Sequence, residues 1–182
     1  LHERGGEMAE AGAKVLVVDD ESYVRDIICR KLSRESYECD QAENAEKALA
    51  LITQGSYECI LSDINMPGMD GIELLRNIRV ADPDVAVIMV TGAPDLDGAL
   101  EAMRLGAYDH LCKPLNLDQL SLTVERAIEK KRLVEENREY QRNLESKVQE
   151  RTKQLHEANE ELRRLFMGSI KALAQALEAK DE

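Results

Sequence analysis

Five polar residues of this 182-residue chain each come at the end of a short apolar run, namely Asp19, Asp20, Asp63, Thr91 and Lys113. Carboxylate oxygens are the ligands of hard cations such as Mg²⁺, and Lys and Thr side chains bind phosphate oxygens. A carboxylate can also act as the nucleophile and form an aspartyl phosphate. The sequence has no Ser/His/Asp or Cys/His arrangement, P-loop or dinucleotide-binding glycine motif. If the five residues meet, they favour phosphoryl transfer onto an aspartate.

The apolar runs predict strands that are buried on both faces, as in a parallel sheet. The predicted strands are 14–18, 37–42, 59–62, 85–90 and 108–112, of which 37–42 is the weakest. Segments with helical periodicity alternate with them, at 23–33, 45–54, 71–80, 96–105 and from Leu117 onward. Ser22 and Asn44 are candidate caps of the first two helices, and Asp70 of the third. This alternation predicts a doubly wound α/β fold, whose ligands lie at the carboxyl ends of the strands, so the five polar residues are expected to converge.

Charge divides the chain into two parts. Residues 1–128 hold 24 acidic and 12 basic residues, whereas residues 129–182 hold 12 of each. Neither part has the basic surface of a nucleic-acid-binding protein, so we expect no direct contact with DNA or RNA. No run is long enough to span a membrane.

The N-terminal residues and the cysteines indicate the cellular compartment of the protein. Residues 1–12 have no signal-peptide core and are predicted to be a disordered leader of a cytoplasmic protein. The four scattered cysteines are predicted to be single buried thiols, not disulfides or a zinc site.

Four sequence blocks resemble the signature of a bacterial response-regulator receiver domain: VLVVDDE, LSDINMPGMDG, VIMVTGA and GAYDHLCKP. The resemblance covers residues 13–128 and implies a five-stranded sheet in the order 2-1-3-4-5. It also implies that a partner histidine kinase phosphorylates Asp63. Asp20 and Asp63 would then bind Mg²⁺ directly, Asp19 would act mainly through water, and the backbone carbonyl of Asn65 would complete the metal shell.

The resemblance further implies that Lys113 pairs with the phosphoryl group, that Thr91 turns to hydrogen-bond it, and that the Lys113–Pro114 bond is cis. The family usually has an aromatic switch residue three positions before the lysine, where this chain has His110. His110 is therefore either a modified switch residue or a structural residue on a dimer face. Tyr108 is the nearby aromatic residue, and strand alternation predicts that it shares a face with His110.

Beyond residue 128 the sequence predicts one long helix, because no proline occurs after Pro114 and the only glycine is Gly168. Ten apolar residues recur at helical spacing, and Asn137 and Asn159 lie on the same seam. The ten are Leu133, Tyr140, Leu144, Val148, Leu155, Leu162, Phe166, Ile170, Leu173 and Leu177. This pattern favours a parallel homodimeric coiled coil over 129–166, with a single helix docked on its own domain as the alternative. The mean spacing is nearer an 11-residue repeat than a heptad, so the coil is expected to be nearly straight.

The segment 167–182 is rich in alanine and resembles the entry helix of an HD-GYP cyclic di-GMP phosphodiesterase domain. We therefore expect a helical stub of an output domain absent from this chain, which would be a truncation of a longer regulator. The chain itself is expected to be a phosphoacceptor switch that is not a turnover enzyme. One alternative is a dimerisation scaffold that is never phosphorylated. Another is an Asp-dependent phosphatase, which is disfavoured because the sequence VDDES replaces the DxDx[TV] motif of such enzymes.

Overall fold

A computed structural model describes residues 12–92 and 95–178, without the side chains of Leu96 and of residues 173–178. The chain forms two compact units, one that ends at Leu133 and one that begins at Val134. The expected leader lies almost entirely outside the described residues, as do the last four residues of the expected output stub. The side chains of Leu173 and Leu177 are also outside the description.

The first unit is built on a five-stranded parallel sheet in the order β2-β1-β3-β4-β5. Its strands are β1 (Lys14–Val18), β2 (Glu38–Ala42), β3 (Cys59–Asp63), β4 (Ala86–Thr91) and β5 (Asp109–Cys112). All residues of β3 and β4 are buried, as expected for central strands covered on both faces. The predicted fold class, strand order and all five strands are confirmed.

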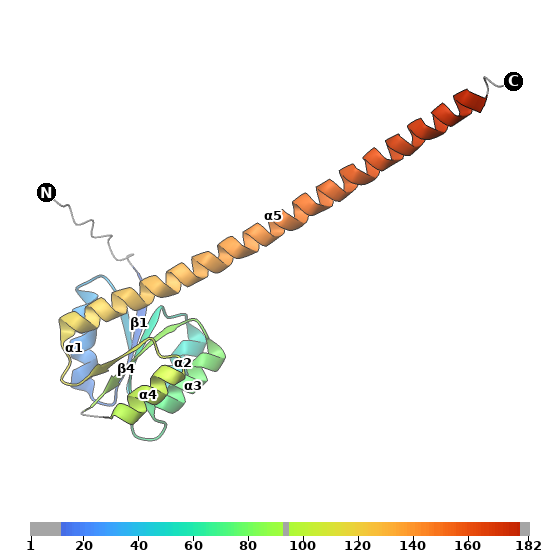
Figure 1. The fold of residues 1–182 in the computed structure, drawn as a ribbon. Coiled ribbons are helices and arrows are strands. Elements are labelled where there is room, and N and C mark those ends of the chain that lie inside the picture. Colours follow the sequence, from blue (N-terminus) through green and yellow to red (C-terminus); the bar gives the residue numbers. More distant parts are fainter. Residues whose placement is uncertain (1–11, 93–94, 179–182) are drawn as a thin grey trace. The chain divides into compact units, whose positions relative to one another are not determined.

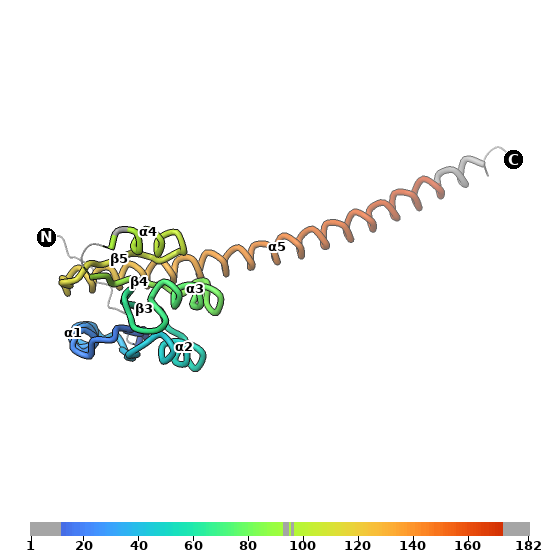
Figure 2. Tube along the Cα trace, turned by 90° about the horizontal axis from the view of Figure 1, so that it is seen from below, coloured from blue at the N-terminus to red at the C-terminus, as the bar shows by residue number. Residues whose placement is uncertain are grey.

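Helices cover both faces of this sheet (Figure 1). They are α1 (Ser22–Ser33), α2 (Ala45–Gln54), α3 (Gly71–Ala81), α4 (Leu96–Arg104) and α5 (Leu117–Glu178). Figure 2 shows α4 beside β5 and places α1 and α2 toward the opposite edge of the sheet. The aliphatic core forms one cluster under α2 and α3 and a second under α1 and the first turns of α5.

The loops that follow the strands end in side-chain caps at two of the three predicted positions. Asn44 Oδ1 accepts a hydrogen bond from Lys47 N, and Asp70 Oδ1 accepts one from Glu73 N. The prediction for Ser22 is wrong, because Ser22 is already helical and Glu21 precedes the helix. Asp19 Oδ1 accepts a hydrogen bond from Glu21 N, at 2.9 Å, so a residue of the acidic pair contacts the start of α1.

All four cysteines are free thiols, as predicted, but only Cys29 and Cys59 are buried. Cys39 is partly exposed. Cys112 is exposed, which corrects the expectation of a buried thiol. Its strand, β5, forms the edge of the sheet, so its surroundings are less complete than those of a central strand.

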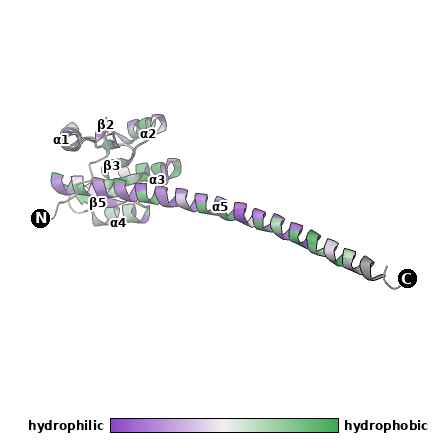
Figure 3. Ribbon diagram, turned by 90° about the horizontal axis from the view of Figure 1, so that it is seen from above, coloured by the Kyte–Doolittle hydropathy of each residue, from purple (hydrophilic) through white to green (hydrophobic). Residues whose placement is uncertain are grey.

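Helix α5 runs without interruption for 62 residues. Its first turns contribute Leu120, Val124 and Ala127 to the core of the first unit. In the second unit the helix is polar over most of its surface with recurring apolar turns (Figure 3), and the described seam residues from Tyr140 to Ile170 are exposed. Within the described part of the chain, no helix is long and apolar enough to cross a membrane.

Candidate functional site

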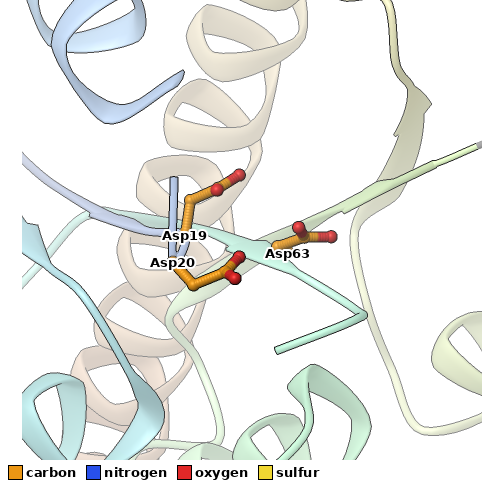
Figure 4. Close-up of side chains that lie close together, drawn as sticks. All are labelled: Asp19, Asp20 and Asp63. Atoms are coloured by element: carbon orange, nitrogen blue, oxygen red, sulfur yellow. The ribbon is translucent and has the colours of Figure 1, made fainter. Parts of the chain in front are cut away.

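Three carboxylates meet where β1 and β3 end (Figure 4). Asp19 and Asp20 follow β1, Asp63 is the last residue of β3, and one oxygen from each lies within 4.8 Å of the others. Asp19 and Asp63 are buried, whereas Asp20 is exposed. β1 and β3 are neighbours in the sheet, so their ends bring together residues that are more than 40 positions apart in the sequence.

Lys113 brings a positive charge to the two buried carboxylates. Its Nζ lies 2.8 Å from Asp19 Oδ2 and 2.8 Å from Asp63 Oδ2. Burial lowers the pKa of the Lys113 ammonium, but its hydrogen bonds and charge attraction to Asp19 and Asp63 outweigh this and raise the pKa above its usual value. Burial also raises the pKa of Asp19, although Lys113 and the amide of Glu21 oppose the change. The site therefore holds a permanent cation against closely spaced anions.

The loop after Asp63 fits closely around the carboxylate. Asn65 N donates a 3.3 Å hydrogen bond to Asp63 Oδ1, so both oxygens of Asp63 have partners. A hydrogen bond from Gly71 N to the carbonyl of Ile64 closes the loop at 2.9 Å. A Cβ atom at Gly71 would come within 2.0 Å of the carbonyl oxygen of Asp63, so only glycine fits this position.

Thr91 is the last residue of β4, and Lys113 directly follows β5. These two strands are neighbours in the sheet, because β4 pairs with β5 as well as with β3. Lys113 N donates a 2.7 Å hydrogen bond to the carbonyl of Thr91. Thr91 is buried, and its Oγ1 donates to the carbonyl of Gly92 at 3.0 Å. The Lys113–Pro114 bond is cis, as the resemblance to receiver domains implies. All five predicted polar residues thus lie at the carboxyl edge of the sheet.

His110 and Tyr108 have different surroundings. His110 is exposed, and its Nδ1 lies 4.0 Å from Asp109 Oδ1. Tyr108 precedes β5 and is partly buried against the α1/α5 cluster, with Lys130 Nζ 5.2 Å from its ring centre. Strand alternation does not extend to Tyr108, because the strand begins at Asp109. Whether His110 acts as a switch residue stays a prediction.

Glu21, directly before α1, and Arg25, within α1, also contact the site, and the sequence analysis predicted neither of them. Glu21 Oε1 lies 3.3 Å from Lys113 Nζ. Arg25 Nη1 donates to the main-chain carbonyls of Asp19 and Asp20, at 2.6 and 3.2 Å. The spacing Glu21–Arg25 is one helical turn directly after the acidic pair, which is the signal that could have indicated them.

The donor set fits Mg²⁺. It consists of oxygen atoms only, and one oxygen of each of its three carboxylates lies within 4.8 Å of the others. Asp19, Asp20 and Asp63 would hold the ion, and a contact from the backbone carbonyl of Asn65 stays a prediction. A parallel α/β fold with carboxylates, a lysine and a threonine at the carboxyl ends of its strands has the residue types that phosphoryl transfer to a carboxylate requires.

Residues 15–125 match the family model described as the response regulator receiver domain, and the chain belongs to this family. Receiver domains are Mg²⁺-binding phosphoacceptor modules of two-component systems and are phosphorylated by histidine kinases. The chain is 42% identical over 114 residues to the DNA-binding transcriptional regulator NtrC of Salmonella typhimurium, which covers 63% of this chain and 24% of NtrC. It therefore spans about a quarter of the length of that relative.

Other relatives are of a size similar to the first unit. Sporulation initiation phosphotransferase F of Bacillus subtilis is 36% identical over 107 residues, covering 59% of this chain and 86% of that protein. A receiver-domain structure from Clostridium thermocellum is 36% identical with a TM-score of 0.65, covering 67% of this chain and 98% of that one. The signal receiver domain of an HD domain-containing protein from Pseudomonas fluorescens Pf-5 is 30% identical with a TM-score of 0.63, covering 65% of this chain and 96% of that one.

Proposed function

We propose that Asp63 is the residue that accepts the phosphoryl group from a histidine kinase. The observation that carries this assignment is the position of Asp63 between two charges of opposite sign. Lys113 contacts its Oδ2 at 2.8 Å, and the Asp19–Asp20 pair lies within 4.8 Å. Of the three acidic residues, only Asp63 is buried at the end of the central strand and has a loop closed around it.

In the proposed reaction, a carboxylate oxygen of Asp63 attacks the phosphorus of a phosphohistidine. The new P–O bond forms as the P–N bond breaks, and the histidine nitrogen leaves. Lys113 stabilises the charge on the phosphoryl oxygens, and the amide of Asn65 orients the carboxylate. Mg²⁺, when bound by Asp19, Asp20 and Asp63, supplies additional charge neutralisation.

Thr91 is the proposed sensor of the modification. Its hydroxyl bonds to the neighbouring carbonyl of Gly92, which is a local contact that a phosphoryl oxygen can replace. Thr91 is buried, so its rotation toward Asp63 changes the packing behind β4. His110, on the neighbouring strand, is the residue proposed to respond to this change.

The second unit is proposed to transmit the signal as a parallel homodimeric coiled coil. Support comes from the uninterrupted helix, the exposed apolar seam and the two seam asparagines. We further propose that a longer parent protein carries an HD-GYP phosphodiesterase output. The alanine-rich residues 167–182 and the receiver of an HD domain-containing protein support this output. The NtrC relative, which is described as DNA-binding, is the competing precedent.

The acceptor is tested with acetyl phosphate and Mg²⁺, followed by intact mass measurement and borohydride trapping of the acyl phosphate. The wild-type chain should gain one phosphoryl group, whereas Asp63→Asn should gain none, because an amide cannot form an acyl phosphate. Asp97→Asn, an exposed position on α4, is the matched control and should be labelled like the wild type. Equal labelling of Asp63→Asn and the wild type would overturn the assignment.

A further inference from the structure

Arg25, near the start of α1, reaches back to the turn that carries the acidic pair. Its Nη1 donates hydrogen bonds to the main-chain carbonyls of Asp19 and Asp20, at 2.6 and 3.2 Å. Its Nε donates to Gln41 Oε1 at 3.4 Å, and Gln41 lies on β2 opposite Val17 of β1. One partly buried side chain thus connects α1, the end of β1 and the edge strand β2.

The two carbonyls that Arg25 holds lie on either side of the Cα atom of Asp20. The Asp19 carbonyl belongs to the planar peptide before that atom, and the Asp20 carbonyl belongs to the planar peptide after it. Hydrogen bonds to both planes restrict the φ and ψ angles of Asp20, and these angles set the direction of its Cα–Cβ bond. Arg25 therefore orients the Asp20 carboxylate through the backbone.

Asp20 is the member of the acidic cluster that depends most on this support. Asp19 is buried, and it is held by Lys113 Nζ at 2.8 Å from its Oδ2 and by Glu21 N at 2.9 Å from its Oδ1. Asp63 is also buried and is paired with Lys113. Asp20 is exposed, yet one of its oxygens lies within 4.8 Å of an oxygen of each of the other two carboxylates. Its place in the cluster therefore depends on its backbone conformation.

We propose that Arg25 is a positioning residue for Mg²⁺, and that it acts by holding the backbone that aims the Asp20 carboxylate into the acidic cluster. This inference rests on the proposed function, in which Asp19, Asp20 and Asp63 hold the ion. Residues that orient metal ligands from behind typically change metal affinity by about 10–100-fold when they are replaced. An effect of this size is therefore expected from a side chain that does not itself bind the metal.

The geometry requires a guanidinium and not merely a positive charge. A guanidinium is planar and carries several fixed donors, so it bonds to Gln41 through Nε and to the two carbonyls through Nη1. A lysine ammonium is a point charge at the end of a flexible chain, and it cannot occupy both positions. Arg25→Lys therefore keeps the charge but loses the orientation.

Charge and positioning predict opposite effects when Arg25 is replaced by an uncharged residue. Arg25 places a positive charge next to a site that would bind a cation, so by charge alone its removal should strengthen Mg²⁺ binding. If its role is to orient Asp20, its removal should weaken Mg²⁺ binding. The direction of the change in affinity therefore separates the two roles.

The test is a calorimetric Mg²⁺ titration of the full, unphosphorylated chain. Arg25→Met and Arg25→Lys should each raise the dissociation constant for Mg²⁺ by roughly 10-fold or more. Arg30→Met removes a positive charge from an exposed position of the same helix, and it should not weaken binding. Melting curves in EDTA verify that each variant is folded, and Arg25→Lys, the milder change, decides the question if Arg25→Met does not fold.

A second measurement determines whether Arg25 acts through Asp20. Asp20→Ala alone should weaken Mg²⁺ binding, and adding Arg25→Lys should weaken it little further, because the carboxylate that Arg25 orients is already gone. Fully additive losses would overturn the role of Arg25, as would wild-type or tighter binding in Arg25→Lys, and both results would leave the metal site intact. Unchanged binding in Asp20→Ala would instead overturn the proposed metal site, and this inference with it.

Discussion

The ammonium nitrogen of Lys131 lies 2.9 Å from Oε2 of Glu58, the residue directly before the strand that ends in Asp63. Lys131 also donates to the carbonyl of Tyr57 at 3.3 Å. Strand β3 therefore has the proposed phosphoacceptor at one end and a contact to α5 at the other. Lys131 lies just before Leu133, where the first unit ends, so this contact holds the last part of α5 that belongs to the unit.

We expect Lys131→Met to lower the free energy of unfolding of the first unit. The Lys131 side chain is largely buried, and its loss leaves Glu58 and the Tyr57 carbonyl without this donor, at a cost of about 1–3 kcal/mol. Urea denaturation measured by circular dichroism provides the check. Lys147→Met, at an exposed position of the second unit, is the matched control and should be nearly neutral. Equal destabilisation by the two substitutions would show that the contact has no specific role.

Asp19→Asn should stabilise the metal-free chain at neutral pH. Burial raises the folded-state pKa of Asp19, so folding favours its protonated form. The stabilising contribution of this group is present below its unfolded pKa and is lost as pH rises through the folded value. The melting temperature in EDTA should therefore be higher for Asp19→Asn than for the wild type at neutral pH, and the two should converge as the pH falls to about 4, near the unfolded pKa of an aspartate.

Mg²⁺ should stabilise the Asp19→Asn variant less than it stabilises the wild type. Mg²⁺ should raise the melting temperature of the wild type more than that of Asp19→Asn, because the variant has lost one carboxylate. Glu129→Gln, which removes an exposed charge from α5, should follow the wild type in both titrations. A wild-type metal response in Asp19→Asn would exclude Asp19 from the metal environment.

Gly71→Ala should destabilise the chain and slow phosphorylation. The new methyl group would overlap the carbonyl oxygen of Asp63, so the loop that holds the acceptor must move. We expect a loss of about 1–3 kcal/mol, as for other overpacking substitutions, measured by urea denaturation. Gly55→Ala is the control, since its Cβ would meet only one atom, at 3.9 Å. Wild-type labelling by acetyl phosphate in Gly71→Ala would show that the acceptor tolerates the displacement.

The sequence predicted most of the fold because the strongest signals were local. Strands β3 and β4 are buried on both faces and therefore read as continuous apolar runs, and their ends identified Asp63 and Thr91. The caps at Asn44 and Asp70 were predictable because each side chain bonds to an amide three residues away.

The predictions that failed depend on contacts between elements that are distant in the sequence. Ser22 is not a cap because it is already part of α1, and Asp19, which belongs to the site, bonds to the Glu21 amide. Cys112 is exposed because β5 is an edge strand, a fact that follows from the strand order and not from the apolar run.

The second unit should hold two chains together. Light scattering at tens of micromolar should give twice the 20.5 kDa of one chain, if the coil has a Kd of ~1 μM. Leu155→Glu, on the seam, should reduce the mass toward that of one chain, whereas Gln154→Glu, beside the seam, should leave the dimer intact. A monomeric wild-type chain at these concentrations would refute the coiled-coil dimer.

Occupation of Asp63 should change the packing of this dimer. The charge added at Asp63 recruits Thr91 and Lys113, and Lys113 lies four residues before the start of α5. Packed helices respond to such a change by switching between discrete arrangements, so a rotation or register shift is expected along the coil.

The measurement is the distance across the dimer between spin labels attached through Asn143→Cys, an exposed position beside the seam residue Leu144, in a chain that also carries Cys112→Ser. Adding beryllofluoride and Mg²⁺ should shift this distance in the labelled chain but not in a labelled chain that also carries Asp63→Asn. Because the two labelled chains differ only at the acceptor, a shift confined to the first must originate at Asp63. Identical distances with Asp63 demonstrably occupied would mean that the second unit only dimerises and does not transmit the signal.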